Sequence, residues 1–302
     1  MNMSNREQFN ADRGKQIDLQ RRGNVLSDKE KIGNMMIQTK LPLLTFPSLT
    51  ETGLVKHCFT TREGGVSEGI FRSLNLSFSR NDREDAVREN FRRVAEALEV
   101  DKDSFVFTDQ THTTNVLRVT ADDAGKGFTR ERGWNDIDGL ITNEPGLTLS
   151  AFFADCVPLY FVDPVHKAIG LSHSGWRGTA NRMGSVTIEA MKREFETDPA
   201  ELVCAIGPCI CGSCYEIGPE VAEQFAEGFG HRKDDILRDD RNGKYHLDLK
   251  KANRLILEEA GVRPENISDS GVCTCCYPDL LFSHRASKGR RGNLGAFLAL
   301  DC

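Results

Sequence analysis

The stretch KAIGLSHSGWRG, residues 167–178, joins a short apolar segment to a glycine-rich turn. Residues 167–172 have the length and composition of a buried β-strand. After Gly175, apolar residues recur over 183–191 at the spacing of an amphipathic helix. His173 therefore lies at the carboxyl end of a predicted strand and just before a helix, where α/β proteins place residues that handle ligands.

A cysteine and a second histidine occur in comparable contexts. Cys156 lies in ADCVPL, residues 154–159, at a break between two strand-like segments, and His112 lies in the polar segment QTH, residues 110–112. Two imidazoles and one thiolate suit zinc, and three protein ligands leave a fourth position for water, as in catalytic zinc sites. Free cysteine is also often a small buried core residue, and His112 equally suits a polar loop. His112, Cys156 and His173 are thus candidate zinc ligands that only a fold can bring together.

The rest of the chain alternates short apolar segments with amphipathic ones and shows no internal repeat. This pattern predicts a mixed α and β fold. A segment rich in glycine and charge, residues 121–135, predicts a long loop, and long loops are often functional. The expected strands are residues 116–119, 139–142, 147–153, 159–162 and 202–206, and the expected helices are residues 82–100, 248–260 and a segment around 221–225.

Several motifs along the chain occur together in one known family. They are FTTREGGVS at 59–67, SLNL at 73–76, ENFRR at 89–93, QTH at 110–112, ADCVPL at 154–159, HSGWRG at 173–178, IGPCI at 206–210 and CYEIG at 214–218. With these motifs the chain resembles the laccase-domain family, also called multicopper polyphenol oxidase-like, from about Leu41 to its C-terminus. HSGWRG and ADC together are the most specific part of the match.

The resemblance implies a single compact α+β domain with a mixed β-sandwich core flanked by helices. It implies that His112, Cys156 and His173 are zinc ligands, and that Asn75 and Arg93 hold the nucleoside or its phosphate partner. A planar guanidinium suits bidentate contacts with phosphate or a purine edge. The alternative for Arg93 is a solvated position on a charged helix.

The chain departs from the family pattern at two places. The usual Gln-Val-His is Gln-Thr-His here, and a C-terminal segment that is commonly Ser-Tyr-Arg-Arg is Ser283-His284-Arg285-Ala286. The second change removes one arginine from that segment. Separately, Asp155 adjoins Cys156 and is our candidate for proton transfer or for orienting a metal ligand.

The overall composition narrows the classes of partner. The 302 residues have a formal net charge of −6 and no basic block, which argues against nucleic acid and anionic membrane as partners. No apolar run approaches the ~20 residues of a membrane span, and the N-terminus lacks the apolar segment of a secretory signal. We therefore expect a cytoplasmic protein. The resemblance implies that its partners are a small-molecule nucleoside and phosphate. The oligomeric state is not predicted.

The polar residues 1–38 form a separate segment that the resemblance does not cover. Their low content of aromatic residues predicts a disordered or weakly helical extension. We expect the catalytic domain to occupy residues 39–302.

Ten cysteines offer a second place for a metal. Cys211 and Cys214 form one CxxC pair, and Cys273 and Cys276 form another. In a zinc ribbon the two pairs are usually about 15–20 residues apart, and here they are much farther apart. A structural zinc or iron–sulfur site at these four residues stays an open alternative. Disulfides are not expected in a reducing cytosol.

The function we favour is that of a zinc-dependent purine nucleoside enzyme. The resemblance implies phosphorolysis of adenosine, inosine, guanosine and methylthioadenosine to base and ribose 1-phosphate, with adenosine deamination as a further activity. Zinc lowers the pKa of bound water and so supplies hydroxide near neutral pH, which suits deamination. The H-x-E signature of zinc deaminases does not occur in this chain.

Other functions fit the same residues. A Cys-His hydrolase would use Cys156 as nucleophile and a histidine as base, and within the family this includes editing of peptidoglycan precursors. A copper-dependent polyphenol oxidase would use the same two histidines and cysteine. A multicopper oxidase also needs His-x-His pairs as copper ligands, and this chain has seven histidines and no such pair. We therefore expect copper only as an ion that binds adventitiously in vitro. A non-enzymatic binding module is the last alternative.

Overall fold

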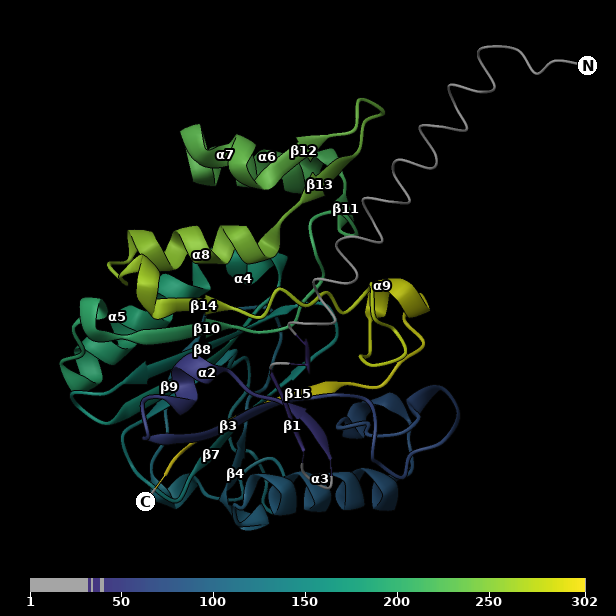
Figure 1. Cartoon of the computed structure of the whole chain (residues 1–302), viewed down its shortest axis with the longest axis vertical. Helices are drawn as coiled ribbons and strands as arrows, with labels where there is room; N and C mark the ends of the chain where they lie inside the picture. Colours follow the sequence, from purple (N-terminus) through teal and green to yellow (C-terminus); the bar gives the residue numbers. More distant parts are fainter. Residues whose placement is uncertain (1–31, 34, 39–40, 302) are drawn as a thin grey trace, which may run out of the picture.

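The computed structural model describes residues 32–33, 35–38 and 41–301. Within these residues two six-stranded sheets pack face to face, and helices cover the outer face of each sheet (Figure 1). The layers therefore follow the order helix, sheet, sheet, helix. Among the described helices, none is long and apolar enough to cross a membrane. The chain forms the single α+β domain that the sequence predicts.

The first sheet joins the two ends of the described chain. Its strand order is β1–β2–β3–β15–β7–β4, so the last strand lies at the centre, between β3 and β7. β4 runs parallel to β7, and the other neighbouring strands are antiparallel. The strands are β1 Met36–Gln38, β2 Pro42–Leu44, β3 Val55–Thr60, β4 Phe105–Phe107, β7 Thr148–Phe153 and β15 Leu294–Leu300.

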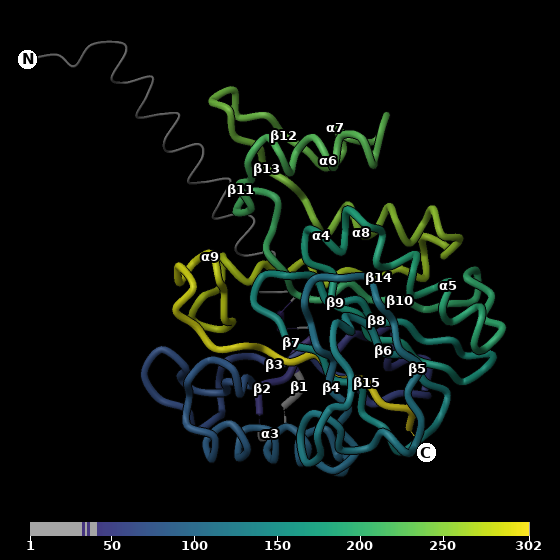
Figure 2. The backbone as a smooth tube through the Cα atoms, turned by 180° about the vertical axis from the view of Figure 1, so that it is seen from behind, coloured from purple at the N-terminus to yellow at the C-terminus, as the bar shows by residue number. Residues whose placement is uncertain are grey.

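The second sheet has the antiparallel pair β8–β9 at its centre. Its strand order is β14–β10–β8–β9–β6–β5, with β14 parallel to β10 and β5 parallel to β6. A small sheet of order β11–β13–β12 lies beyond it, near α6 and α7 (Figure 2). The strands are β5 Val116–Arg118, β6 Gly139–Thr142, β8 Val157–Asp163, β9 Ala168–Ser174, β10 Val203–Ile206, β14 Ile267–Asp269, β11 Glu216–Ile217, β12 Leu237–Asp239 and β13 Tyr245–Leu247.

Helices cover the two outer faces unequally. α3 packs on the first sheet, whereas α4, α5 and α8 pack on the second (Figures 1 and 2). α9 lies in the long segment between β14 and β15. The helices are α2 Pro47–Thr50, α3 Glu84–Leu98, α4 Trp176–Ala180, α5 Met183–Phe195, α6 Pro219–Phe229, α7 Lys233–Ile236, α8 Leu249–Glu259 and α9 His284–Ser287.

Alternation along the central strands explains the two apolar layers around the second sheet. In β8, Leu159 and Phe161 face the helices, whereas Tyr160 and Val162 face the first sheet. Successive side chains of a strand point to opposite faces, so a strand buried on both sides is apolar at every position. For this reason the residues of β8 are buried at every position and do not alternate between apolar and polar.

The predicted helix at 82–100 contains α3, whose apolar residues recur at the helical period. Val87, Phe91, Val94 and Leu98 are all buried against the first sheet. Spacings of four, three and four residues place these side chains on one face. The helix ends at Glu99, which has a left-handed φ of 55°.

The predicted strands at 116–119, 139–142, 147–153 and 202–206 correspond to β5, β6, β7 and β10. The expected boundary at residue 38 needs a correction, because β1 already belongs to the first sheet and pairs with β2. Ile32 and Met35 are buried between the sheets, so a few apolar residues anchor this part of an otherwise polar segment. Residues 1–31 and 34 of the expected extension lie outside the described residues.

Candidate metal centre and cavity

The register of β8 on β9 brings Cys156 and His173 to one end of the second sheet. Val157 pairs with Ser174, and Pro158 pairs with His173. Cys156 immediately precedes β8 and therefore lies beside the end of β9. Pro158 lacks an N–H group and so withdraws one donor from the ladder where this site begins.

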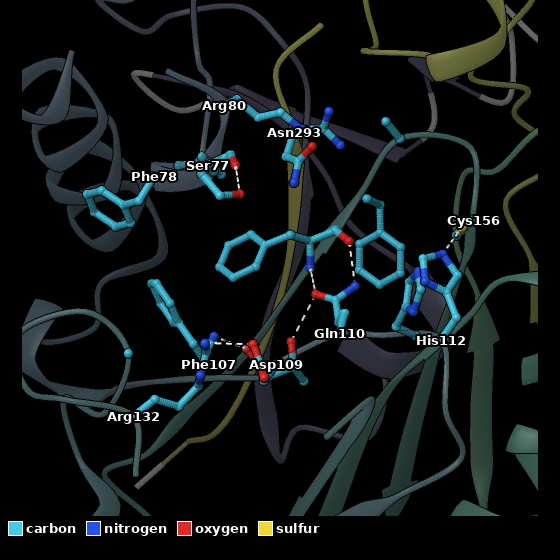
Figure 3. Close-up of a pocket in the computed structure, with 18 of the residues that line it drawn as sticks. Ser77, Phe78, Arg80, Phe107, Asp109, Gln110, His112, Arg132, Cys156 and Asn293 are labelled. Carbon is cyan, nitrogen blue, oxygen red and sulfur yellow. Dashed lines mark hydrogen bonds and ion pairs between the residues drawn. The ribbon is translucent and has the colours of Figure 1, made fainter. Parts of the chain in front are cut away.

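His112 reaches the same place from the segment that crosses between the two sheets. β4 belongs to the first sheet and β5 to the second. Gln110 fixes the crossing segment, because its side chain both donates to the carbonyl oxygen of Phe152 and accepts from the Phe152 amide, each at 2.7 Å. His112 then adopts a left-handed φ of 68°, which is uncommon outside glycine. Its ring lies beside Cys156 (Figure 3).

Asp138 joins the two histidine segments. Its fully buried carboxylate accepts a 2.7 Å hydrogen bond from Nδ1 of His173. It also accepts from the backbone amides of Thr111, His112 and Thr113, at 2.9–3.2 Å. Burial raises the pKa of Asp138, but the hydrogen bond and charge of His173 and the amides outweigh it, so the pKa lies below its ordinary value. One carboxylate thus fixes the ring of His173 and the turn that contains His112.

The three ligand atoms are close enough for one metal ion. The nitrogens of His112 and His173 and the sulfur of Cys156 all lie within 4.8 Å of one another, and Cys156 Sγ is 4.0 Å from His112 Nε2. A tetrahedral zinc ion would separate sulfur and nitrogen by about 3.6 Å, given ordinary Zn–S and Zn–N bonds. With Nδ1 of His173 used by Asp138, its Nε2 is left for a metal. The set therefore fits a tetrahedral ion with one position left for another ligand.

Charge within the group favours the thiolate that a metal requires. Burial raises the pKa of the Cys156 thiol, but the neighbouring charge of His173 and the hydrogen bond from His112 lower it to about 6. Burial lowers the pKa of His173, but the thiolate and the Asp138 carboxylate raise it to about 9. Without a metal these two groups therefore form a thiolate–imidazolium pair.

The three ligands lie in the wall of a cavity of about 550 Å³. Ser77, Phe78 and Arg80 lie on the side opposite His112 and Cys156 (Figure 3). The predicted loop at 121–135 contributes to the wall, as expected for a functional loop. The size is in the range of small-molecule sites. The remaining lining residues are Leu76, Ser79, Phe107, Thr108, Asp109, Gln110, Gly127, Arg130, Glu131, Arg132, Phe152, Phe153, Ala154, His173, Arg291 and Asn293.

Three arginines of the cavity, Arg80, Arg130 and Arg291, carry charge that no carboxylate pairs with in the described part of the chain. Arg80 makes no hydrogen bond or ion pair there. Arg130 is held by the carbonyl oxygens of Asp122 and Ala124. Arg291 is 9 % exposed, its guanidinium donates to Gly292 and Asn293, and its buried Nε has no partner. Burial and the neighbouring charge of Arg80 lower the pKa of Arg291 to about 10. A buried donor without a partner and two adjacent guanidinium groups suit an anionic ligand.

The structure separates the other predicted site residues from the cavity wall. Asn75 is fully buried behind it, where its side chain donates to Asp82 and accepts from the amide of Asn293, both at 2.9 Å. Arg93 is held outside the cavity, by Glu89 at 2.9 Å and by the carbonyl oxygen of Gly64 at 2.8 Å. Arg285 in the changed C-terminal segment contacts the carbonyl oxygens of Cys214 and Glu216.

Asp155 faces away from the ligand rings. Its two carboxylate oxygens accept hydrogen bonds from the hydroxyl of Thr274 and from the amide of Arg285, both at 2.7 Å. The contact that orients His173 comes instead from Asp138, which the sequence analysis does not select. The only sequence feature that could have pointed to Asp138 is its position directly before the predicted strand at 139–142. Arg80 and Arg291 carry no motif and lie 211 positions apart in the sequence.

The two CxxC pairs also come together. The sulfurs of Cys211, Cys214, Cys273 and Cys276 lie within 4.8 Å of one another and form a second group that can hold a metal.

Comparisons with known proteins agree with this description. The family model described as multi-copper polyphenol oxidoreductase laccase matches residues 56–301. A curated relative from Deinococcus radiodurans, named purine nucleoside phosphorylase, is 40% identical over 262 residues, which are 86% of this chain and 93% of the relative. The purine nucleoside phosphorylase YlmD of Bacillus subtilis is 38% identical over 243 residues, with 80% and 87% covered.

Solved structures show the same fold. The hypothetical protein YfiH of Bacillus licheniformis superposes with a TM-score of 0.83 at 35% identity, over 87% of this chain and 98% of that one. YlmD of Geobacillus stearothermophilus superposes with a TM-score of 0.80 at 33% identity, over 89% and 99%.

Proposed function

The chain belongs to the family described as multi-copper polyphenol oxidoreductase laccase, and we propose that it is a zinc-dependent purine nucleoside phosphorylase. Relatives with 38–40% identity are named purine nucleoside phosphorylase. The observation that carries the proposal is the composition of one cavity. It combines the metal-binding group of His112, Cys156 and His173 with the unpaired guanidinium groups of Arg80 and Arg291.

In this proposal Arg80 and Arg291 bind the phosphate. Phosphate is an oxyanion that accepts paired hydrogen bonds from guanidinium groups, and the hydroxyls of Ser77 and Ser79 lie on the same side of the cavity. The partly exposed ring of Phe78 provides apolar surface for the purine in the cavity wall. A phosphate oxygen forms a bond to C1′ of the ribose while the bond from C1′ to the purine nitrogen breaks. The base leaves with the electron pair and takes up a proton, which gives free base and ribose 1-phosphate.

The metal group would act on the substrate in the same cavity. Zinc fits the two imidazoles and one thiolate better than a hard oxygen-preferring cation does. When bound, it supplies a Lewis acid that polarises a substrate oxygen. Asp138 holds the tautomer of His173 in which Nε2 is the metal ligand. The pKa of Cys156, below that of an ordinary thiol, favours the ligating thiolate.

Two further residues position other residues, rather than contacting the substrate, in this proposal. Asn75 positions the segment before Arg80, because it links Asp82 to the backbone of Asn293. Asp155 acts by positioning Cys156 rather than by transferring a proton. Its carboxylate is held by Thr274 and by the amide of Arg285, and this fixes the backbone directly before Cys156. The resemblance implies a direct contact of Arg93 with the nucleoside or phosphate, whereas Arg93 is held by Glu89 and Gly64 in the structure and has no part in this proposal.

Product analysis with and without phosphate tests the proposal. Purified protein of known zinc content is incubated with adenosine, inosine, guanosine or methylthioadenosine, and products are separated by chromatography. We expect free base and ribose 1-phosphate only when phosphate is present, with 5-methylthioribose 1-phosphate as the sugar product of methylthioadenosine. His173→Ala should form neither the base nor the sugar phosphate. Inosine formed from adenosine without phosphate would instead identify deamination as the main reaction. Unchanged nucleosides with zinc-loaded protein would exclude both.

A second candidate is a metal-free cysteine hydrolase. Asp138, His173 and Cys156 form a carboxylate–imidazole–thiolate series, in which the carboxylate orients the base beside a thiol of lowered pKa. Such a series activates a cysteine nucleophile. The family resemblance adds peptidoglycan precursors as a substrate class. Irreversible loss of activity with a thiol alkylating agent, but not with a chelator, would favour this function. Loss of activity with the chelator as well, followed by recovery of the chelated protein when zinc is added, would support the phosphorylase.

A copper-dependent polyphenol oxidase has less support. A blue-copper centre adds a weak axial ligand, commonly methionine, to two histidines and a cysteine. None of the described residues that line the cavity is a methionine.

A further inference from the structure

The two CxxC pairs meet because two parallel strands deliver them. β14 runs parallel to β10, with Cys204 opposite Ile267 and Ile206 opposite Asp269. The segments after these strands therefore leave the sheet at the same end, and Cys209 pairs with Cys273 in an isolated bridge. Cys211 and Cys273 are 62 residues apart, as are Cys214 and Cys276. Each cysteine of one pair thus faces its counterpart in the other pair.

The four sulfurs have the spacing of ligands to a single ion. All lie within 4.8 Å of one another, and Cys214 Sγ is 3.6 Å from Cys276 Sγ. Zn–S bonds of about 2.3 Å in a tetrahedron place the sulfurs about 3.8 Å apart. In a four-iron cluster each thiolate binds a different iron, which spreads the sulfurs farther. The spacing therefore favours one mononuclear ion.

The surroundings compensate the charge that four thiolates bring. The amide of Cys211 donates to Cys273 Sγ at 3.2 Å, as backbone amides do around metal-bound sulfur. The guanidinium of Arg285 lies against the same loop and donates to the carbonyl oxygen of Cys214 at 3.2 Å. None of the four cysteines forms a disulfide, and their exposure ranges from buried to exposed. An ion can therefore reach them.

We propose that Cys211, Cys214, Cys273 and Cys276 bind one structural zinc ion, separate from the metal at His112, Cys156 and His173. Four protein ligands leave no open position, which is the mark of a structural site. Binding replaces the thiol protons by zinc and releases them to solvent, so no oxidant or reductant takes part. The proposal of this second site does not rest on the proposed phosphorylase activity.

The second ion would stabilise the segment that positions Cys156. Thr274, between two of the ligands, donates its hydroxyl proton to Asp155, and the amide of Ile210 donates to the Asp155 carbonyl oxygen at 3.0 Å. Asp155 has a left-handed φ of 90°, a conformation that costs free energy for a residue with a Cβ. The zinc-bound loops would hold Asp155 in this conformation and so fix Cys156, one residue on.

Zinc content tests the site without reference to activity. The full chain, purified under reducing conditions with zinc present, is analysed by elemental mass spectrometry against protein concentration. We expect about two zinc ions per chain in the wild type, one in Cys276→Ser and one in the double variant His112→Ala/His173→Ala. Cys275→Ser is the matched control, because Cys275 lies in the same loop outside the group of four, and it should keep both ions.

X-ray absorption on the His112→Ala/His173→Ala variant makes the test independent of how Cys276→Ser folds. We expect the remaining zinc to have four sulfur ligands at about 2.3 Å. Its removal by a chelator should lower the melting temperature of this variant, since a metal that binds the folded state stabilises it. A variant with no zinc, with iron, with nitrogen or oxygen in its first coordination sphere, or with a Cys214–Cys276 disulfide would overturn the proposal. The phosphorylase proposal would be untouched, because it rests on the composition of the cavity and is tested by nucleoside products.

Discussion

Asp138 Oδ1 accepts a 2.7 Å hydrogen bond from Nδ1 of His173, and the same carboxylate accepts from the amides at 111–113. A single buried side chain therefore orients one metal ligand and shapes the turn that presents another. Removing its charge should disturb both ligands at once, although Asp138 contacts no metal itself.

Asp138→Asn should weaken zinc binding at this centre by about 10- to 100-fold, the usual effect of losing a hydrogen-bonded partner of a metal ligand. The amide keeps the size of the side chain but lacks the negative charge that orients His173. Zinc affinity can be measured by competition with a chromophoric chelator. Asp136→Asn is the control, since Asp136 contacts Thr111 but no ligand ring. Equal loss in the two variants would contradict the role given to Asp138.

Arg291→Met should raise the KM for phosphate by at least about tenfold, equivalent to about 1.4 kcal/mol of lost charge-assisted hydrogen bonding. Arg80→Met should act in the same direction, because the two guanidinium groups face the same cavity. Steady-state rates at varied phosphate measure the effect, with the KM for nucleoside as the internal reference.

Arg93→Met distinguishes a phosphate site at Arg80 and Arg291 from the substrate contact that the family resemblance implies for Arg93. Its guanidinium is held by Glu89 and Gly64 outside the cavity, so we expect the KM for phosphate to stay unchanged. A rise in that KM with Arg93→Met, without one in Arg291→Met, would move the phosphate site to Arg93.

Gly175→Ala should abolish metal binding at His112, Cys156 and His173 while the chain still folds. A Cβ at residue 175 would lie 2.8 Å from His112 Cδ2 and 3.1 Å from Cys156 Sγ, so it would push the ligands apart. Gly178→Ala is the matched control, because its Cβ would meet neighbours at 3.6 Å or more. Zinc content and far-UV circular dichroism measure the two effects. A zinc content in Gly175→Ala equal to that of the wild type would contradict this prediction, because it would mean that His112 and Cys156 still bind zinc beside the added Cβ.

His57 should make the folded state less stable as the pH falls from 6.5 to 5. Burial lowers the pKa of His57 to about 4. Its Nε2 also accepts the Phe46 amide proton, which a protonated ring cannot do. Below pH 6.5 the unfolded chain takes up a proton that the folded chain excludes, so unfolding is favoured. At pH 5 the cost is about 2 kcal/mol.

Urea unfolding between pH 8 and pH 5 measures this cost. His57→Gln has no imidazole, so the difference between the wild-type and variant stability curves isolates this residue from other titrating groups. The variant is expected to be less stable at pH 8, because the imidazole accepts the amide proton of Phe46 at 2.8 Å. A difference curve that is flat across this range would contradict the prediction.

The local elements were predictable from neighbouring residues. Val87, Phe91, Val94 and Leu98 indicate the helix α3 because a helix buries one face at a period of 3.6 residues. The run at 167–172 indicates β9 because a strand buried on both faces needs apolar residues throughout. The motif residues His112, Cys156 and His173 were selected as ligands for their chemistry, and the fold brings them together.

Partners distant in the sequence could not be predicted in the same way. In the sequence, nothing distinguishes Asp138 from other acidic residues that precede a strand. Its role depends on the pairing of β6 with β9, which places His173 within hydrogen-bond distance. Arg80 and Arg291 become neighbours when the last strand enters the centre of the first sheet.

The four cysteines show the same division between sequence and tertiary structure. Their spacing in the chain argued against a shared site, yet the parallel pairing of β10 with β14 makes them neighbours. The sequence by itself determined the helices, the strands and the chemical types at the site, because these depend on periodicity and on residues a few positions apart. The tertiary structure decided which charges and thiols meet, because those encounters depend on the order and register of strands far apart in the chain.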